Sequence, residues 1–319
     1  FWLFAYGGAS GAHCAEFAAR LGVGKVVVPF AAPVFSALGI ALTDLQYAHV
    51  RSEPAPLDDA PETLAVVNAA FAEAGEISRE IAERAFSNEV VTPGITTLED
   101  VAWWMSDQLL ARGLDSSFDM PSVYITGPGG ILATSSDRII QRGDLLMLDW
   151  GVGFLDFYTD MKRVAYVLRE GEIDAPPGIR HAFSQALRVR DVMKASIKPA
   201  PTAQQALDQT WEALGSAGFN RVEFNQPSDD PTVTDVVIGP HSVGNWGHGL
   251  GPSLAFFNPT RLTYELRPGT LISVELFAFT SVPEWGGAKA RIPLEDDAVV
   301  TERGVEWLYP ANRRLLLIK

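Results

Sequence analysis

Apolar residues recur at helical spacing in four stretches after residue 60. These stretches lie at 61–87, 96–113, about 180–198 and about 202–217. The second has a threonine N-cap signal, a carboxylate three residues later and a closing glycine, which are the signals that begin and end a helix. Beyond residue 122 the pattern changes to short strands. Because helices and antiparallel strands interleave without regular alternation, the sequence predicts the α+β class.

The start of the chain predicts a small unit of its own. Strand character is found at 1–6, a glycine-rich turn at 7–11, helical spacing at 12–22 and a second strand at 25–30. Glycines between a strand and a helix can let backbone N–H groups approach a phosphate. Tight turns alone explain such glycines equally well, so both interpretations stay open.

The stretch "RSEPAPLDDAPE" (51–62) separates this unit from the rest. It holds three prolines and several charges, which is typical of a linker. We therefore expect two domains, a short β-α-β appendage at 1–55 and a main domain at 56–319. With 319 residues and 47% hydrophobic content, the chain can bury a sizeable core.

The chain is acidic, with a formal net charge of -14. Nucleic acids and anionic membranes are recognised by clustered Lys and Arg, so we expect neither as a partner. No uninterrupted apolar run approaches the roughly 20 residues of a membrane-spanning helix. The single cysteine, Cys14, excludes an internal disulfide and a cysteine-rich metal site. A reducing, cytoplasmic location is expected, and the start at Phe1 rather than Met suggests a fragment or processed chain.

Two aspartates interrupt an apolar hairpin, "LLMLDWGVGFLDFYTDMKRVAYVL" (145–168). Each run carries an aspartate, Asp149 in the first and Asp160 in the second. Burying an ionised carboxylate costs several kcal/mol unless a partner or a metal compensates the charge. Either both side chains reach solvent, for example by capping the turn, or a cation lies between the strands.

Three more ionisable residues stand in similar settings. They are His248 in "NWGHGLG", Glu275 in "GTLISVELFAF" and Glu295 in "RIPLEDDAVVT". Each has a plain alternative, since His248 can be a core histidine and Glu295 can belong to a solvated acidic face. Shared cations would relieve the burial of all the carboxylates. Oxygen-rich ligands fit Mn²⁺, Fe²⁺, Co²⁺ or Zn²⁺, and two ions roughly 3.5 to 4 Å apart would suit hydrolysis.

The order of these residues resembles the pita-bread metallopeptidases. An Asp is followed by a second Asp eleven positions later, then Gly-His-Gly-x-Gly, a Glu in "PGTLISVE" and a Glu before "VVTERGVEWL". Methionine aminopeptidase, aminopeptidase P, prolidase and creatinase share this pattern, which covers roughly 61–319. The resemblance implies a pita-bread α+β fold, two divalent metal ions (Mn, Co, Zn or Fe) and a peptide or small amide substrate, most plausibly of Xaa-Pro type. It also implies a possible homodimer.

The resemblance assigns a role to each ligand. Asp149 and Asp160 would bind one metal, with Asp160 also bridging to the second. His248 and Glu275 would bind the second metal and Glu295 would bridge the two. Glu275 would also be the proton shuttle for the attacking water.

Two positions depart from the peptidase pattern. A histidine is usual seven residues after the Gly-His-Gly histidine, where this chain has Ala255, and another usually precedes the "GD" strand, near Thr134. His241, seven residues before His248, can supply a catalytic imidazole from another direction or be purely structural. The missing histidines keep open a non-peptidase enzyme of this fold or a non-catalytic binding protein.

The first fifty residues resemble another family. "GGASGAHCAEFAARLGVGKVVVPFAAPVFSALGIALTDLQYAHVRS" is similar to a segment of the hydantoinase A and oxoprolinase family, which contains ATP-dependent amidohydrolases. Most of that family's nucleotide-binding domain is absent here. ATP-dependent hydrolysis of a hydantoin or oxoproline is therefore the least favoured alternative.

Overall fold

The computed structural model separates the chain into two compact units, Phe1–Tyr47 and Ala48–Lys319. It describes residues 2–5, 10–28, 61–116, 118, 120–135, 137–154, 157–223, 226–243 and 249–319. The expected linker up to residue 60 and the expected boundary between 55 and 56 lie outside the described residues. The two-domain division at that boundary therefore stays a prediction.

The first unit has the expected order of strand, helix and strand. β1 (Leu3–Phe4) and β2 (Val26–Val27) pair in parallel, and α1 (Ser10–Leu21) connects them. Helix α1 ends before Gly22, whose φ of +66° is a left-handed conformation that glycine adopts without strain.

Two helices open the second unit, and the chemistry at their ends explains their bounds. α3 (Pro61–Ala85) begins with a proline, which is favourable in the first turn because no N–H is lost there. α4 (Leu98–Ala111) begins with a capping box, in which Thr97 and Asp100 each accept a hydrogen bond from the other's backbone N–H. The threonine and the carboxylate that the sequence indicated therefore set this helix start.

A five-stranded sheet follows these helices, with its strands in the order β17-β8-β5-β3-β4. The strands are β3 (Ser122–Gly127), β4 (Gly130–Leu132), β5 (Leu145–Trp150), β8 (Met161–Val167) and β17 (Leu316–Ile318). β5 and β8 are the two apolar runs of the predicted hairpin and pair antiparallel. A smaller hairpin of β6 (Gly153–Phe154) and β7 (Phe157–Tyr158) connects them.

Two four-stranded sheets complete the unit. One has the order β14-β13-β10-β9 and the other the order β11-β12-β15-β16. Their strands are β9 (Asn220–Arg221), β10 (Asp235–Ile238), β11 (His241–Ser242), β12 (Leu271–Ser273), β13 (Leu276–Ser281), β14 (Lys289–Leu294), β15 (Asp297–Thr301) and β16 (Gly304–Trp307). The helices in this part are α5 (Pro177–Ser196), α6 (Ala203–Ser216), the short α7 (Pro259–Leu262) and the 3₁₀ turn η2 (Pro283–Trp285).

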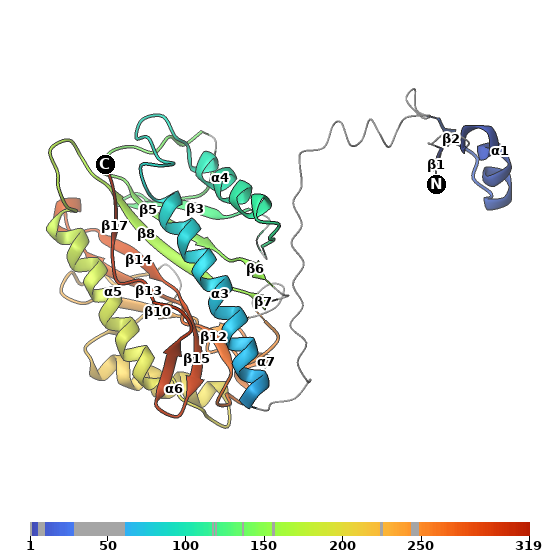
Figure 1. The fold of residues 1–319 in the computed structure, drawn as a ribbon. Helices are drawn as coiled ribbons and strands as arrows, with labels where there is room; N and C mark the ends of the chain where they lie inside the picture. The colour runs from blue at the N-terminus through green and yellow to red at the C-terminus, as the bar shows by residue number, and fades with distance from the viewer. Residues whose placement is uncertain are drawn as a thin grey trace. The chain divides into compact units, whose positions relative to one another are not determined.

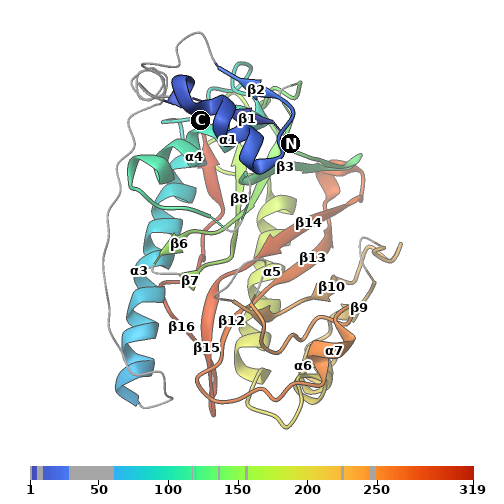
Figure 2. The same ribbon diagram turned by 90° about the vertical axis from the view of Figure 1, so that its right-hand side faces the viewer.

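The central strands of the five-stranded sheet, β5 and β8, are buried on both faces. Leu146 and Leu148 of β5 belong to one apolar cluster, which contains residues of α3 and α4. Leu145 and Met147, which alternate with them, belong to the other cluster, with α5, β13 and β14. Figures 1 and 2 show α3 and α5 running on either side of these central strands. The interleaved helices and antiparallel strands confirm the α+β class.

In the described part of the chain, no helix combines the length and the apolar character that crossing a bilayer requires.

Candidate metal centre

Strand register brings the first acidic residues together. Asp149 lies directly opposite Lys162 in the antiparallel β5–β8 pair. Asp160 stands just before β8, where its N–H lies 3.2 Å from Oδ2 of the buried Asp297. Because side chains alternate along a strand, the register orients Asp149 and Lys162 to the same side of the sheet.

Glu275 and Glu295 join from the other sheets. Glu275 lies between β12 and β13, and its carbonyl accepts a hydrogen bond from Gly239 N at 3.1 Å. A side chain at Gly239 would meet Glu275 Oε2 at 2.9 Å, so glycine leaves room for that carboxylate. Glu295 follows β14, and its carbonyl accepts from the N–H of Lys162 at 3.2 Å.

The side chains converge on the Lys162 ammonium, whose Nζ lies 3.1 Å from Asp149 Oδ2 and 2.8 Å from Glu275 Oε1. Nζ also donates to Glu295 Oε2. The Lys162 side chain is 6% exposed and that of Glu295 is fully buried. The structure thus brings together all four carboxylates that the sequence indicated, and their role as metal ligands stays a prediction.

Histidine 241 is the imidazole of this cluster. Its Nε2 lies 3.4 Å from Glu295 Oε1, 3.7 Å from Asp160 Oδ2 and 3.9 Å from Glu275 Oε2. His248, the imidazole ligand expected from the sequence, belongs to the segment 244–248, which lies outside the described residues. Among the residues that the structure describes, His241 is the histidine that lies next to the carboxylates.

The crowding of charge changes how these groups ionise. Burial raises the pKa of Asp149 to about 6, although Lys162 acts in the opposite direction. Burial, together with the charges of Glu295 and Asp149, raises the pKa of Asp160 well above its usual range. Burial also opposes ionisation of Glu295, but Lys162 and His241 outweigh it and lower its pKa to about 2. Lys162 and His241 therefore let Glu295 remain charged without contact with water.

One divalent ion fits the residues present. Asp160, His241 and Glu295 each offer a ligand atom, and these atoms all lie within 4.8 Å of one another. Oxygen and imidazole nitrogen are the donors that Mn²⁺, Fe²⁺, Co²⁺ and Zn²⁺ accept. Asp149 Oδ1 is buried and lacks a hydrogen-bond partner in the described part of the chain, which is a further sign that a cation is needed nearby.

The two positions that lack the usual histidines are occupied differently. The Thr134 hydroxyl donates to the carbonyl of Val123 and accepts from its N–H, both at 2.9 Å, so it is held by the backbone of β3. Ala255 is fully buried. Neither position supplies an acid, a base or an oxyanion donor through its side chain.

The "EDD" segment is not a solvated face. Glu295, Asp296 and Asp297 are all fully buried. Asp297 accepts a hydrogen bond from the Tyr309 hydroxyl at 2.9 Å as well as from Asp160 N, and so fixes the backbone at Asp160. The alternative that Glu295 belongs to a solvated acidic face is therefore wrong, because these three carboxylates lie in the interior.

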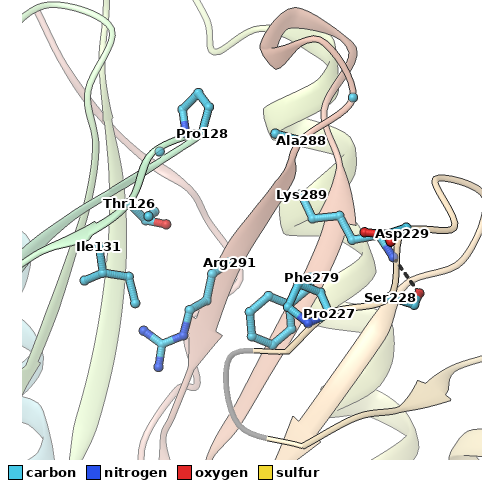
Figure 3. A pocket seen from close by; sticks show the side chains of 13 residues that line it. Thr126, Pro128, Ile131, Pro227, Ser228, Asp229, Phe279, Ala288, Lys289 and Arg291 are labelled. Atoms are coloured by element: carbon cyan, nitrogen blue, oxygen red, sulfur yellow. Dashed lines mark hydrogen bonds between the residues drawn. The ribbon is translucent and has the colours of Figure 1, made fainter.

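A cavity of about 530 Å³ is lined by residues of the β3–β4 hairpin, of β13 and of β14. Figure 3 shows Ile131 and Pro128 on one side of it and Phe279 and Arg291 on the other. The Arg291 guanidinium carbon lies 3.9 Å from the centre of the Phe277 ring, and Lys162 Nζ lies 5.6 Å from the same centre. Arg291, which lines the cavity, and Lys162 of the carboxylate cluster thus both lie near the Phe277 ring.

Sequence reasoning missed Lys162 and Arg291. Lys162 follows Asp160 by two residues, a spacing that places side chains on the same face of a strand and was the available signal. Arg291 gave no signal, because only the three-dimensional structure shows that its guanidinium reaches the cavity.

Comparison with known families gives a decisive match. Residues 69–302 match the model of metallopeptidase family M24. The chain belongs to this family. The resemblance to pita-bread metallopeptidases is therefore confirmed. Residues 1–49 match the hydantoinase/oxoprolinase family model, which confirms the resemblance of the first segment.

M24 relatives are similar over part of their length. An uncharacterized peptidase, YqhT of Bacillus subtilis, is 26% identical over 257 residues, which are 76% of this chain and 62% of that protein. A Xaa-Pro dipeptidase of Pyrococcus furiosus is 23% identical over 57% of this chain and 44% of the relative. The chain thus spans less than two thirds of these relatives.

Solved M24 structures show the same fold. An X-Pro aminopeptidase of Thermotoga maritima has a TM-score of 0.57 at 18% identity, over 96% of this chain and 72% of that one. A prolidase of Pyrococcus horikoshii also has a TM-score of 0.57 at 18% identity, over 99% and 76%. The expected pita-bread fold is confirmed.

Proposed function

We propose that the chain is a metal-dependent hydrolase of peptide or small amide bonds. The observation that carries this proposal is one cluster of four carboxylates, Asp149, Asp160, Glu275 and Glu295, gathered about Lys162 and His241. A cluster of carboxylates shielded from water is costly unless bound cations neutralise its charge. Membership of M24 supports hydrolysis, and the named Xaa-Pro dipeptidases make a proline-containing dipeptide the leading substrate.

A divalent ion held by Asp160, His241 and Glu295 would supply Lewis acidity to a water and a substrate carbonyl. Glu275 is the residue placed to move the proton. Its side chain is 15% exposed, whereas that of Glu295 is fully buried. We assign Glu275 as the base that takes the proton from the attacking water and returns it to the leaving amine.

Arg291 is the group that would recognise the end of a short substrate. Within the described part of the chain its guanidinium forms no ion pair, and its Nε is buried without a hydrogen-bond partner. Arginine binds carboxylates through paired N–H groups. A dipeptide with its free carboxylate on Arg291 and an apolar ring against Phe279 fits the cavity lining.

Metal analysis followed by turnover assays tests the proposal. The full chain is purified, bound metal is measured, and a panel of Xaa-Pro and non-proline dipeptides is assayed with added Mn²⁺ or Co²⁺. Turnover that disappears with a chelator and in the Asp160→Asn variant is expected, because that variant loses a ligand charge. Full activity in the Asp160→Asn variant, with or without the chelator, would overturn the assignment.

A second candidate is a binding protein that keeps the fold without catalysis. The Thr134 hydroxyl already donates its proton to the backbone, and Ala255 offers only a buried methyl group. Both observations favour this candidate, because neither side chain can stabilise an oxyanion. Bound metal without turnover on any peptide or amide would select this candidate. We further propose, from the family resemblance and the single cysteine, a cytoplasmic protein that pairs with a second copy.

A further inference from the structure

Lys162 lies where a cation would bind. Its ammonium contacts Asp149, Glu275 and Glu295, three of the five ligands expected for a metal pair. A metal bound to the same oxygens at about 2.0 to 2.2 Å would need the volume that Nζ fills. One cation or the other can occupy this position.

The backbone holds Lys162 in place from both sides. It pairs with Asp149 across the β5–β8 ladder, and its N–H donates to the carbonyl of Glu295. The side chain is 6% exposed, so the ammonium cannot turn to solvent without a large rearrangement. A register shift that moved it would also reverse every neighbouring side chain.

The remaining ligands form a separate group. Asp160, His241 and Glu295 offer atoms within 4.8 Å of one another, and Glu295 also contacts Lys162. When all four carboxylates are ionised, as ligands are, they carry four negative charges. One ammonium and one divalent ion neutralise three of them, whereas an ammonium with two divalent ions would leave the site positive.

We propose that the Lys162 ammonium replaces one metal of the pair, so that this chain binds a single divalent ion at Asp160, His241 and Glu295. The inference rests on the proposed metal-dependent function. It makes Lys162 a built-in positive charge beside the ion, in contact with the proton-transferring Glu275 at 2.8 Å. The metal count is then set by a residue that is not itself a ligand.

Metal stoichiometry tests this inference without any assay of activity. Calorimetric titration with Mn²⁺ and elemental analysis of the dialysed protein are made on the wild type and on Lys162→Met, which keeps the apolar stem and removes the charge. We expect one ion per chain in the wild type and two in the variant. The matched control is Lys289→Met, because Lys289 is also 6% exposed and pairs with a buried aspartate, Asp235. It should bind one ion.

The outcomes separate this inference from the proposed function. Two ions in the wild type, or one ion in both the wild type and Lys162→Met, would overturn the role of Lys162 alone. No ion in any of these proteins would overturn the metal-dependent function itself. Electron paramagnetic resonance of the wild type, loaded with Mn²⁺ and then freed of unbound ion, does not depend on the variant folding. An uncoupled six-line signal is expected, and a spin-coupled pair would refute the inference.

Discussion

Asp296 is the residue whose loss should disturb the fold most. Its Oδ1 lies 2.8 Å from Arg163 Nη2 and its Oδ2 lies 2.9 Å from Arg190 Nη1, and all three side chains are fully buried. Arg163 also donates to the carbonyl of Glu295 at 3.2 Å. The triad therefore joins β8, α5 and the segment that carries a predicted ligand. The perturbation we consider is Asp296→Asn, which removes the charge and keeps the shape.

The size of the effect follows from burial. Without the carboxylate, two guanidinium groups remain in the interior with no opposing charge at that point. Breaking a buried ion pair from one side costs about 3 to 5 kcal/mol. The amide oxygen of asparagine still accepts one hydrogen bond, so we expect a loss of about 3 kcal/mol. This is a large share of the roughly 5 to 15 kcal/mol that stabilises a typical domain.

Equilibrium unfolding in urea measures this loss. The matched control is Asp191→Asn, since Asp191 pairs with Arg313 at 3.3 Å but its side chain is 49% exposed. An exposed pair contributes less than about 1 kcal/mol, so the control should unfold near the wild-type midpoint. If Asp296→Asn lowers the free energy of unfolding by less than about 1 kcal/mol, at an unchanged slope against urea concentration, the reasoning is refuted. The Asp296 carboxylate would then not be needed to offset the two buried guanidinium groups.

Two further predictions concern metal and substrate binding. Burial acts to lower the pKa of His241, but its hydrogen bond to Glu295 and the charges of Glu295 and Glu275 raise it above the ordinary 6.5. A protonated imidazole cannot bind a metal, so Mn²⁺ affinity should rise between pH 6 and pH 8 in calorimetry; a constant affinity would contradict this. Arg291→Met should raise the KM of a dipeptide about 10- to 100-fold, because a charged hydrogen bond contributes about 1.5 to 3 kcal/mol. The C-terminally amidated dipeptide is the control, and an equal rise for both substrates would show that Arg291 does not read the carboxylate.

The sequence was sufficient for the elements with strong local signals. Helix α4 begins where Thr97 and Asp100 indicated, and the β5–β8 hairpin holds the apolar runs that were read as strands. The inner β6–β7 hairpin was not foreseen, because two-residue strands leave no periodic pattern to detect. The local sequence thus predicted where a helix begins better than it predicted how two strands are connected.

The candidate site was predictable in its carboxylates but not in its cations. A carboxylate in an apolar strand is a conspicuous signal, whereas a lysine beside an aspartate is common on any surface. That Lys162 is internal depends on its pairing with Glu295, which lies 133 positions away. The assignment of His248 as the imidazole ligand stays a prediction, because residues 244–248 lie outside the described part of the chain.

Strand β8, which carries Lys162, is paired along both of its edges. All seven of its residues are buried, β5 pairs with one edge, and the Glu295 bridge and β17 pair with the other. Segments tied on both edges open only with the global unfolding of a domain, not through local fluctuation. The backbone around Lys162 should therefore stay closed over the lifetime of the folded chain. Exchange of ions at the cluster must then proceed by rotation of side chains, at rates set by the rotamers of Asp160 and His241.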